Sequence, residues 1–209
     1  MANPSQKIHL GLKILKYKTP EKLINILNDL IDKNLKEEKL IPHGRRLVGE
    51  IKQEWNVYKI LPTNLLSFFR DCTINYIKNE LPLLRGKKLS GCFNSCWIND
   101  QIEREYNPAH THYGESSLGL SSVLFLKVPK SVSEAKQTLN KDEPVKDGRL
   151  EFIAYTKTFM GENQYLVTPQ VGDLYLFPYE LPHLVYPFKG EGVRRSLSFN
   201  LDITVENHG

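Results

Sequence analysis

The chain has 209 residues, of which 40% are hydrophobic and 10% aromatic, so it can bury a sizeable core. Its 28 Lys and Arg against 24 Asp and Glu give a net charge of +4, too small and too evenly spread an excess to favour nucleic acid as a partner. No apolar run approaches the roughly 18 residues of a membrane span, and the N-terminus lacks a signal-peptide pattern. Three cysteines without C-x-x-C spacing indicate reduced, packed thiols. We therefore expect one globular, cytoplasmic domain with no membrane partner.

The first 86 residues are predicted to form a helical support segment. Residues 7–17 alternate well enough for an early strand, which ends before Thr19-Pro20-Glu21. That triplet is typical of a helix start, with a hydroxyl that can cap, a proline at the first helical position and an acid in the first turn. Apolar residues then recur at helical spacing over residues 20–37, and again over residues 63–79, so two helices are expected.

From residue 87 onward the pattern changes to short runs of β-branched and aromatic residues separated by Gly, Pro, Asn and Asp, which is typical of a β-sandwich or barrel. We expect a long polar loop over residues 130–148. Eight strands favour a jelly roll, so the chain is predicted to be mainly β with N-terminal helices. The expected strands cover residues 88–99, 102–110, 120–128, 149–157, 164–168, 173–178, 182–188 and 193–203.

Three of the six histidines lie in two separated stretches of this β region. His110 and His112 are two residues apart, so on a strand both side chains point to the same face. His183 follows about 70 residues later, and a rolled double sheet can bring the two strands together. A His-x-His pair alone is often structural, but imidazoles bind Fe, Zn, Cu or Ni, and the arrangement predicts a metal site.

A last strand places a polar stripe beside an apolar one. Arg194, Ser196, Ser198 and Asn200 share one face, and Leu197 and Phe199 share the other. A guanidinium that points into a barrel is costly unless an anion meets it, and a carboxylate held by two hydrogen bonds is the natural anion. Arg194 is therefore expected to bind a carboxylate, whereas Arg195 is expected to point outward into solvent.

Taken in order, these motifs resemble the 2-oxoglutarate- and Fe(II)-dependent oxygenase superfamily. The resemblance is closest to the small hydroxylases common in bacteriophage genomes, which are related to the prolyl 4-hydroxylase-like branch. It covers roughly residues 88–203 and implies a double-stranded β-helix, a form of jelly roll, as the catalytic core over residues 87–205 of a single domain spanning residues 1–209. The motifs that carry it are Trp97-Ile-Asn99, His110-Thr-His112, Ser122-Val-Leu-Phe-Leu-Lys-Val-Pro129, Gly172-Asp-Leu-Tyr-Leu-Phe-Pro178, His183 and Arg194-Arg-Ser-Leu-Ser-Phe-Asn200.

The resemblance implies roles for individual residues. His110 and His183 would be iron ligands, and Arg194 would hold the distal carboxylate of 2-oxoglutarate. Ser196 lies where relatives often place a hydroxyl against the same carboxylate, and Asn99 matches a position that contacts the cosubstrate in some relatives. The expected cofactors are Fe(II), the cosubstrate 2-oxoglutarate and O2. The expected reaction couples decarboxylation of 2-oxoglutarate to succinate with hydroxylation of a substrate.

Nothing in the sequence selects that substrate among proteins, peptides and small molecules. The prolyl 4-hydroxylase-like branch favours a peptidyl side chain such as proline. The expected location is the cytoplasm, or a host cytoplasm if the protein is encoded by a phage.

One departure from the superfamily pattern concerns the third metal ligand. Most members have His-x-Asp or His-x-Glu, whereas this chain has His112, which would give a three-histidine site with one less negative charge. Glu115 can supply the missing carboxylate if Tyr113-Gly114 makes a suitable turn. Same-face geometry favours His112, because it needs no special turn.

Two other functions fit parts of the pattern. A cupin-like dioxygenase or isomerase is also a jelly roll, and its four ligands would be His110, His112, Glu115 and His183. The cupin motif before the last of these histidines is matched by Pro169-Gln-Val-Gly-Asp173. Cupins place Glu slightly further from the second His and do not need Arg194. A non-catalytic jelly-roll binding module, with structural or zinc-bound histidines, would likewise tolerate loss of Arg194.

Overall fold

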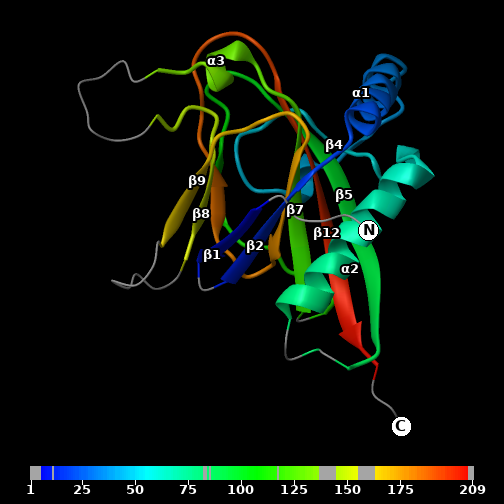
Figure 1. Cartoon of the computed structure of the whole chain (residues 1–209). Coiled ribbons are helices and arrows are strands. Elements are labelled where there is room, and N and C mark those ends of the chain that lie inside the picture. The colour runs from blue at the N-terminus through cyan, green and yellow to red at the C-terminus, as the bar shows by residue number, and fades with distance from the viewer. Residues whose placement is uncertain are drawn as a thin grey trace.

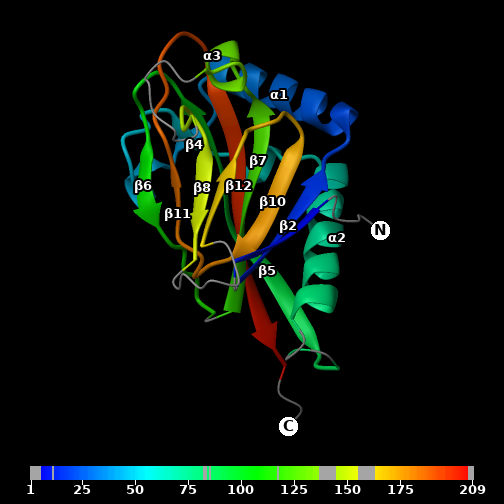
Figure 2. The ribbon, with the colours of Figure 1, turned by 60° about the vertical axis from the view of Figure 1, so that its left-hand side comes forward.

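The computed structural model describes residues 6–10, 12–81, 84, 86–116, 118–136, 145–154 and 163–206. Their strands are β1 (Gln6–Leu10), β2 (Leu12–Lys18), β3 (Ile41–Pro42), β4 (Glu54–Asn56), β5 (Leu89–Gln101), β6 (Asn107–His110), β7 (Leu118–Lys127), β8 (Leu150–Ile153), β9 (Gln164–Val167), β10 (Asp173–Pro178), β11 (His183–Val185) and β12 (Arg194–Val205). They form an eight-stranded sheet in the order β1-β2-β10-β7-β12-β5-β4-β3 and a four-stranded sheet in the order β6-β11-β8-β9 (Figures 1 and 2). All strand pairs are antiparallel, and this double sheet confirms the predicted fold class.

The two predicted helices are α1 (Glu21–Lys36) and α2 (Thr63–Glu80). Both lie against the large sheet on the side away from β8 and β11 (Figures 1 and 2). Their apolar residues join Leu197 and Phe199 of β12 in one core cluster. A second cluster fills the space between the two sheets and includes Phe125, Phe152 and Phe177. The polar stripe of β12 therefore faces the space between the sheets, as the alternation predicted.

Some predicted elements needed correction. Residues 7–17 are not one strand but the hairpin of β1 and β2, in which Leu10 pairs with Leu12. Alternation continues through the turn, so the sequence pattern could not distinguish one strand from two. Thr19 does not cap α1, because Pro20 is the capping residue and no side chain there accepts a hydrogen bond from the first backbone N–H groups of the helix. The first 86 residues therefore contribute strands as well as helices, since β2 pairs with β10 and β4 pairs with β5.

Other predicted elements differ from the structure in their bounds. The strand expected over residues 102–110 is only β6, and part of the strand expected over 149–157 lies outside the described residues. The polar segment 130–148 begins with a short helix, α3 (Lys130–Ser133), and its middle also lies outside the described residues.

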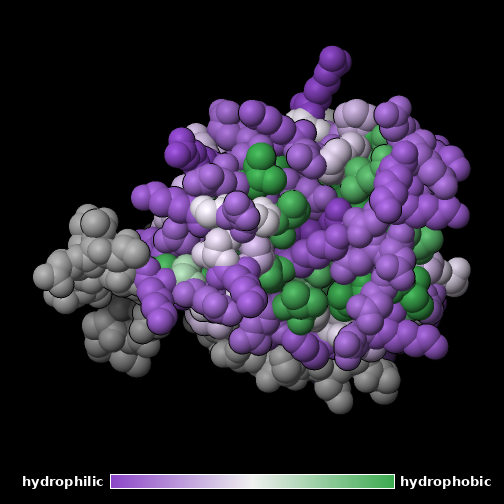
Figure 3. All heavy atoms as spheres, turned by 90° about the horizontal axis from the view of Figure 1, so that it is seen from above, coloured by the Kyte–Doolittle hydropathy of each residue, from purple (hydrophilic) through white to green (hydrophobic). Residues whose placement is uncertain are grey.

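All three cysteines are free, with Cys92 exposed rather than packed. None of the helices in the described part of the chain is both long and apolar enough to span a membrane. The end that carries α1 and α3 is largely hydrophilic (Figure 3).

Arg195 is buried, which contradicts its expected position in solvent. Its side chain is 3% exposed and donates to both carboxylate oxygens of Asp100 at 2.6 Å. It also donates to Asp32 of α1 at 2.6 Å, because α1 covers this face of β12. Burial raises the pKa of Asp32, but hydrogen bonds from Lys127 and Arg195 outweigh it and hold that pKa below its usual value. Arg195 thus links α1 to the large sheet through hydrogen-bonded ion pairs.

Glu54 of β4 is a second buried charged group, and it makes folding stability depend on pH. Its side chain is 6% exposed, and its Oε1 has no hydrogen-bond partner among the described residues. Burial, and then the neighbouring Glu105, raise its pKa from 4.5 to about 7. Because the folded state favours the protonated form, the stabilisation is complete below pH 4.5 and is lost as the pH rises through 7.

We expect Glu54→Gln to remove this dependence. Relative to the variant, the wild type should lose about 3 kcal/mol of unfolding free energy between pH 4.5 and pH 8. Urea denaturation at several pH values measures this difference. Glu50→Gln removes the same charge from an exposed position on the same segment and is the control. Parallel stability curves for Glu54→Gln and the wild type would show that Glu54 is not buried as described.

Candidate metal centre and anion pocket

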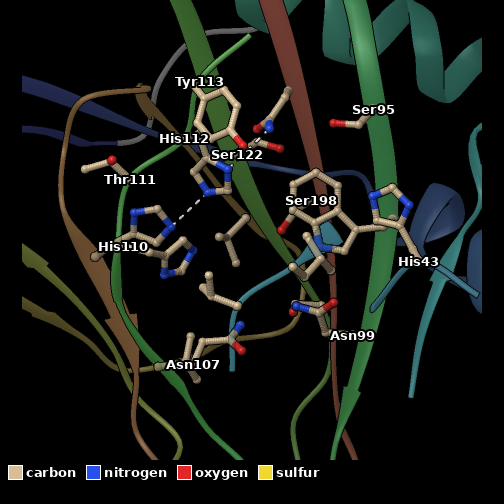
Figure 4. A pocket seen from close by; sticks show the side chains of 18 of the residues that line it. His43, Ser95, Asn99, Asn107, His110, Thr111, His112, Tyr113, Ser122 and Ser198 are labelled. Atoms are coloured by element: carbon tan, nitrogen blue, oxygen red, sulfur yellow. Dashed lines mark hydrogen bonds between the residues drawn. The ribbon is translucent and has the colours of Figure 1, made fainter. Parts of the chain in front are cut away.

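A cavity of about 510 Å³ lies between the two sheets. It is lined by side chains from β5, β6, β7, β11 and β12 and by the segment that follows β6 (Figure 4). All six site residues predicted from the sequence line it: Asn99, His110, His112, His183, Arg194 and Ser196. The folded chain thus brings together residues from four separate stretches.

The three histidines converge at one end of this cavity. His110 ends β6 and pairs in register with His183, which begins β11. His112 lies two residues beyond His110, just past the end of β6 (Figure 4). One ring nitrogen from each of the three residues lies within 4.8 Å of the others, and the Nε2 atoms of His112 and His183 are 3.2 Å apart. Such a cluster can hold a metal ion.

Two of these imidazoles are oriented by backbone carbonyls. Nδ1 of His110 donates to the Pro108 carbonyl at 2.8 Å, and Nδ1 of His183 donates to the Leu181 carbonyl at 3.0 Å. A carbonyl can only accept, so in the neutral ring the lone pair is on Nε2, which is the usual outer-shell arrangement of a metal-binding histidine. Both Nε2 atoms therefore carry a lone pair that a metal ion can bind.

Burial keeps the three imidazoles neutral. It lowers the pKa of His110, and together with the neighbouring His110 it lowers the pKa of His112 to about 3. The pKa of His183 lies well below its usual value because of burial and the two other histidines. Neutral imidazoles are the form that binds metals, so the cluster does not have to lose protons at neutral pH.

Glu115 does not belong to this cluster. Among the described residues, the group of side chains placed to share a metal consists of the three histidines alone. Glu115 is exposed at the cavity rim, and its backbone N–H donates to Asp202 at 3.3 Å. A Cβ on the preceding Gly114 would lie 1.9 Å from Oδ1 of Asp202, so this turn requires glycine. The geometry therefore favours His112 over Glu115.

Arg194 lies in the same cavity and has no counter-ion among the described residues. Its side chain is 1% exposed, and its Nε and Nη2 have no hydrogen-bond partner among the described residues. The guanidinium lies over the Phe125 ring, 5.0 Å from its centre, and burial lowers its pKa to about 9. Ser196 shares its face of β12 and pairs in register with Asn99, whose buried Oδ1 also has no partner there. A buried cation with free donors is the arrangement of an anion site.

Sequence reasoning missed the residues that hold the His112 segment in place. The Tyr179 hydroxyl donates to Asp202 at 3.2 Å, and the Asn94 side-chain amide donates to Asp202 at 3.2 Å. The backbone N–H of His112 donates to the Tyr179 carbonyl at 2.9 Å. Asp202 continues the alternation of the polar stripe of β12, which was the available signal.

A double-sheet fold with three convergent imidazoles and a buried guanidinium that has no counter-ion among the described residues defines a class: non-haem metal enzymes that bind a carboxylate. Residues 95–200, just over half of the chain, match the family described as "Putative 2OG-Fe(II) oxygenase". The chain belongs to this family of enzymes, and the family implies Fe(II) and 2-oxoglutarate as cofactors. The donor set fits them, because imidazoles suit iron and Arg194 suits a carboxylate.

Solved structures share the fold. A prolyl-4-hydroxylase from Pseudomonas putida aligns with a TM-score of 0.57 at 15% identity, covering 93% of each chain. A prolyl hydroxylase from Trichoplax adhaerens, solved with a hypoxia-inducible-factor peptide, aligns with a TM-score of 0.59 at 13% identity, covering 92% of this chain and 83% of that one. HygX from Streptomyces hygroscopicus, with nickel and 2-oxoglutarate bound, gives a TM-score of 0.54 at 10% identity and coverages of 90% and 81%. No curated protein matches the sequence.

Proposed function

We propose that this chain is a 2-oxoglutarate- and Fe(II)-dependent dioxygenase that hydroxylates a substrate, with the three histidines as the metal ligands and Arg194 as the cosubstrate anchor. The observation that carries the proposal is the buried Arg194, which lines the same cavity as the three imidazoles and whose Nε and Nη2 have no hydrogen-bond partner in the described part of the chain. In the reaction, 2-oxoglutarate, O2 and a C–H bond of the substrate give succinate, carbon dioxide and a hydroxylated product. One oxygen atom enters succinate and the other enters the product.

Each residue has a defined task. Nε2 atoms of His110, His112 and His183 would hold Fe(II), which supplies the redox chemistry that activates O2. Arg194 would bind the distal carboxylate of 2-oxoglutarate and so fix the orientation of the keto acid in the cavity. The Ser196 hydroxyl and the Asn99 amide would complete the hydrogen bonds of that carboxylate. The carboxylate would also accept from Nε and Nη2 of Arg194, which have no hydrogen-bond partner among the described residues.

We propose a peptidyl side chain, such as that of proline, as the substrate. Support comes from the fold shared with prolyl hydroxylases from three different sources, one of them the viral collagen prolyl hydroxylase of Paramecium bursaria Chlorella virus-1. Support also comes from the rim of the cavity, where Tyr113 is 89% exposed and Val48 is 46% exposed. Exposed aromatic and apolar side chains at a cavity mouth suit contacts with an extended peptide. A phage source and a cytoplasmic location stay predictions.

The test is an anaerobic titration of Fe(II)-loaded protein with 2-oxoglutarate. The proposal predicts the weak visible charge-transfer band of an iron-chelated keto acid in the wild type, and a weaker band at the same concentrations in Arg194→Ala. Absence of the band in wild-type protein that has bound iron would contradict the proposed function. Succinate release with a panel of proline-containing peptides then tests the substrate class.

A further inference from the structure

His112 differs from the other two imidazoles in what its Nδ1 faces. His110 and His183 donate from Nδ1 to carbonyls, whereas Nδ1 of His112 lies 3.3 Å from the side-chain nitrogen of Asn200. The amide oxygen of Asn200 accepts a hydrogen bond from the Ser121 hydroxyl at 2.9 Å, and Ser121 is fully buried. His112 is thus the one ring of the three whose proton position is set by a side chain.

In this arrangement His112 cannot bind a metal through Nε2. An amide nitrogen only donates, so Nδ1 of His112 must accept and the proton of the neutral ring is on Nε2. That proton lies between the Nε2 atoms of His112 and His183, 3.2 Å apart, where it can be donated to the lone pair of His183. The lone pair of His112 then points at Asn200 and not into the metal cluster.

Rotation of the Asn200 amide by half a turn exchanges its oxygen and nitrogen and so reverses the tautomer of His112. The amide oxygen would then accept from Nδ1–H of His112, and the amide nitrogen would donate to the Ser121 hydroxyl, which can accept as well as donate. The lone pair of His112 moves to Nε2 and joins those of His110 and His183. The hydrogen-bonded groups keep their places, because the oxygen and nitrogen of an amide occupy equivalent positions.

We propose that Asn200, supported by Ser121, is a positioning residue that selects the tautomer of His112 and so makes the Nε2 lone pair of His112 available to a metal ion. This inference rests on the proposed function, because it takes His112 as a ligand. An asparagine suits the task because its side chain offers a donor and an acceptor at interchangeable positions. An aspartate would only accept and would fix the metal-binding tautomer permanently.

The experiment follows the protonated nitrogen directly. Protein labelled with 15N in histidine is studied by NMR without metal and with Zn(II), which is diamagnetic, and His112 is assigned by comparison with His112→Ala. In the wild type we expect His112 to carry its proton on Nε2 without metal and on Nδ1 with zinc. In Asn200→Asp we expect the proton on Nδ1 in both states.

Metal affinity gives a second readout on the same samples. Asn200→Leu keeps the approximate side-chain volume but offers no acceptor, so its zinc affinity should fall about 10- to 100-fold, the usual effect of losing an outer-shell partner. Ser121→Ala should lower the affinity less. Ser198→Ala, on the same face of β12 and in the same cavity, should bind zinc as the wild type does.

Two outcomes would overturn the inference in different ways. If the wild type binds zinc while Asn200→Leu binds it equally well, or His112 keeps its proton on Nε2 in the zinc complex, Asn200 does not select the tautomer and the metal site stands without it. If the wild type binds neither zinc nor Fe(II), the metal site of the proposed function fails together with the inference.

Discussion

Arg194→Met is expected to give a protein that folds at least as stably as the wild type but no longer responds to 2-oxoglutarate. In the metal-loaded wild type, cosubstrate at 100 times its Kd should add about 2.7 kcal/mol of stability, or roughly 5–10 °C in Tm. The variant should show no such shift, because the buried guanidinium is the group placed to meet a carboxylate. Its own Tm should not fall, because methionine removes a buried charge whose Nε and Nη2 have no partner among the described residues.

The neighbouring residue provides a matched control. Arg195→Met removes the same charge one position along β12, but it breaks hydrogen-bonded ion pairs with Asp100 and Asp32. Loss of one partner of a buried pair typically costs 3–5 kcal/mol, so we expect a clear drop in Tm with the cosubstrate response retained in the folded protein. Thermal melts with and without 2-oxoglutarate measure both effects. A full cosubstrate shift in Arg194→Met would exclude Arg194 as the anchor.

The second large effect concerns the third metal ligand. We expect His112→Ala to lower Fe(II) affinity by at least roughly 100-fold, since loss of an outer-shell partner alone costs 10- to 100-fold. Glu115→Gln should bind Fe(II) as tightly as the wild type, because Glu115 lies outside the histidine cluster. Anaerobic calorimetric titration measures both affinities. Weakened binding in both variants would instead favour the four-ligand cupin-like site.

A three-histidine site also predicts how the two cofactors depend on each other. The ligands are neutral, so bound Fe(II) beside Arg194 would leave an uncompensated positive charge that the 2-oxoglutarate dianion offsets. We expect 2-oxoglutarate to raise iron affinity by about 5- to 150-fold, and iron to raise 2-oxoglutarate affinity by the same factor. His112→Asp, which restores the carboxylate, should weaken this coupling. Equal coupling in both proteins would show that charge is not its source.

The local residue pattern was enough to predict the helices and strands and the strand face on which Arg194 and Ser196 lie. The alternation of β12 placed Arg194 and Ser196 in the cavity. His110 and His112 both line it as well, but β6 ends at His110, so His112 reaches the cavity from the segment after the strand and not by strand alternation. Helical periodicity located α1 and α2 to within about two residues.

Local pattern could not predict which residues a strand face contacts in the folded protein. Arg195 was correctly assigned to the opposite face from Arg194, but that face is covered by α1, and its partner Asp32 is distant in the sequence. The anchor of the His112 segment was missed for a related reason, because Asp202 reaches Gly114 and Glu115 only after the two sheets have packed. Alternation specifies a side, whereas tertiary packing specifies the neighbour.

β12 runs the length of the cavity, and its spacing restricts how the protein can change during evolution. Arg194 and Asn200 are six residues apart, about 20 Å of extended chain, and lie on the cavity face, while Leu197 and Phe199 between them fill the core under the helices. Substitutions along the strand can therefore alter one contact at a time. Insertion of a single residue between Arg194 and Asn200 would move the residues on one side of it to the opposite face, so that the two could no longer both face the cavity. New substrate preferences are therefore expected to arise by changes in the loops at the rim, with the length of this strand held constant.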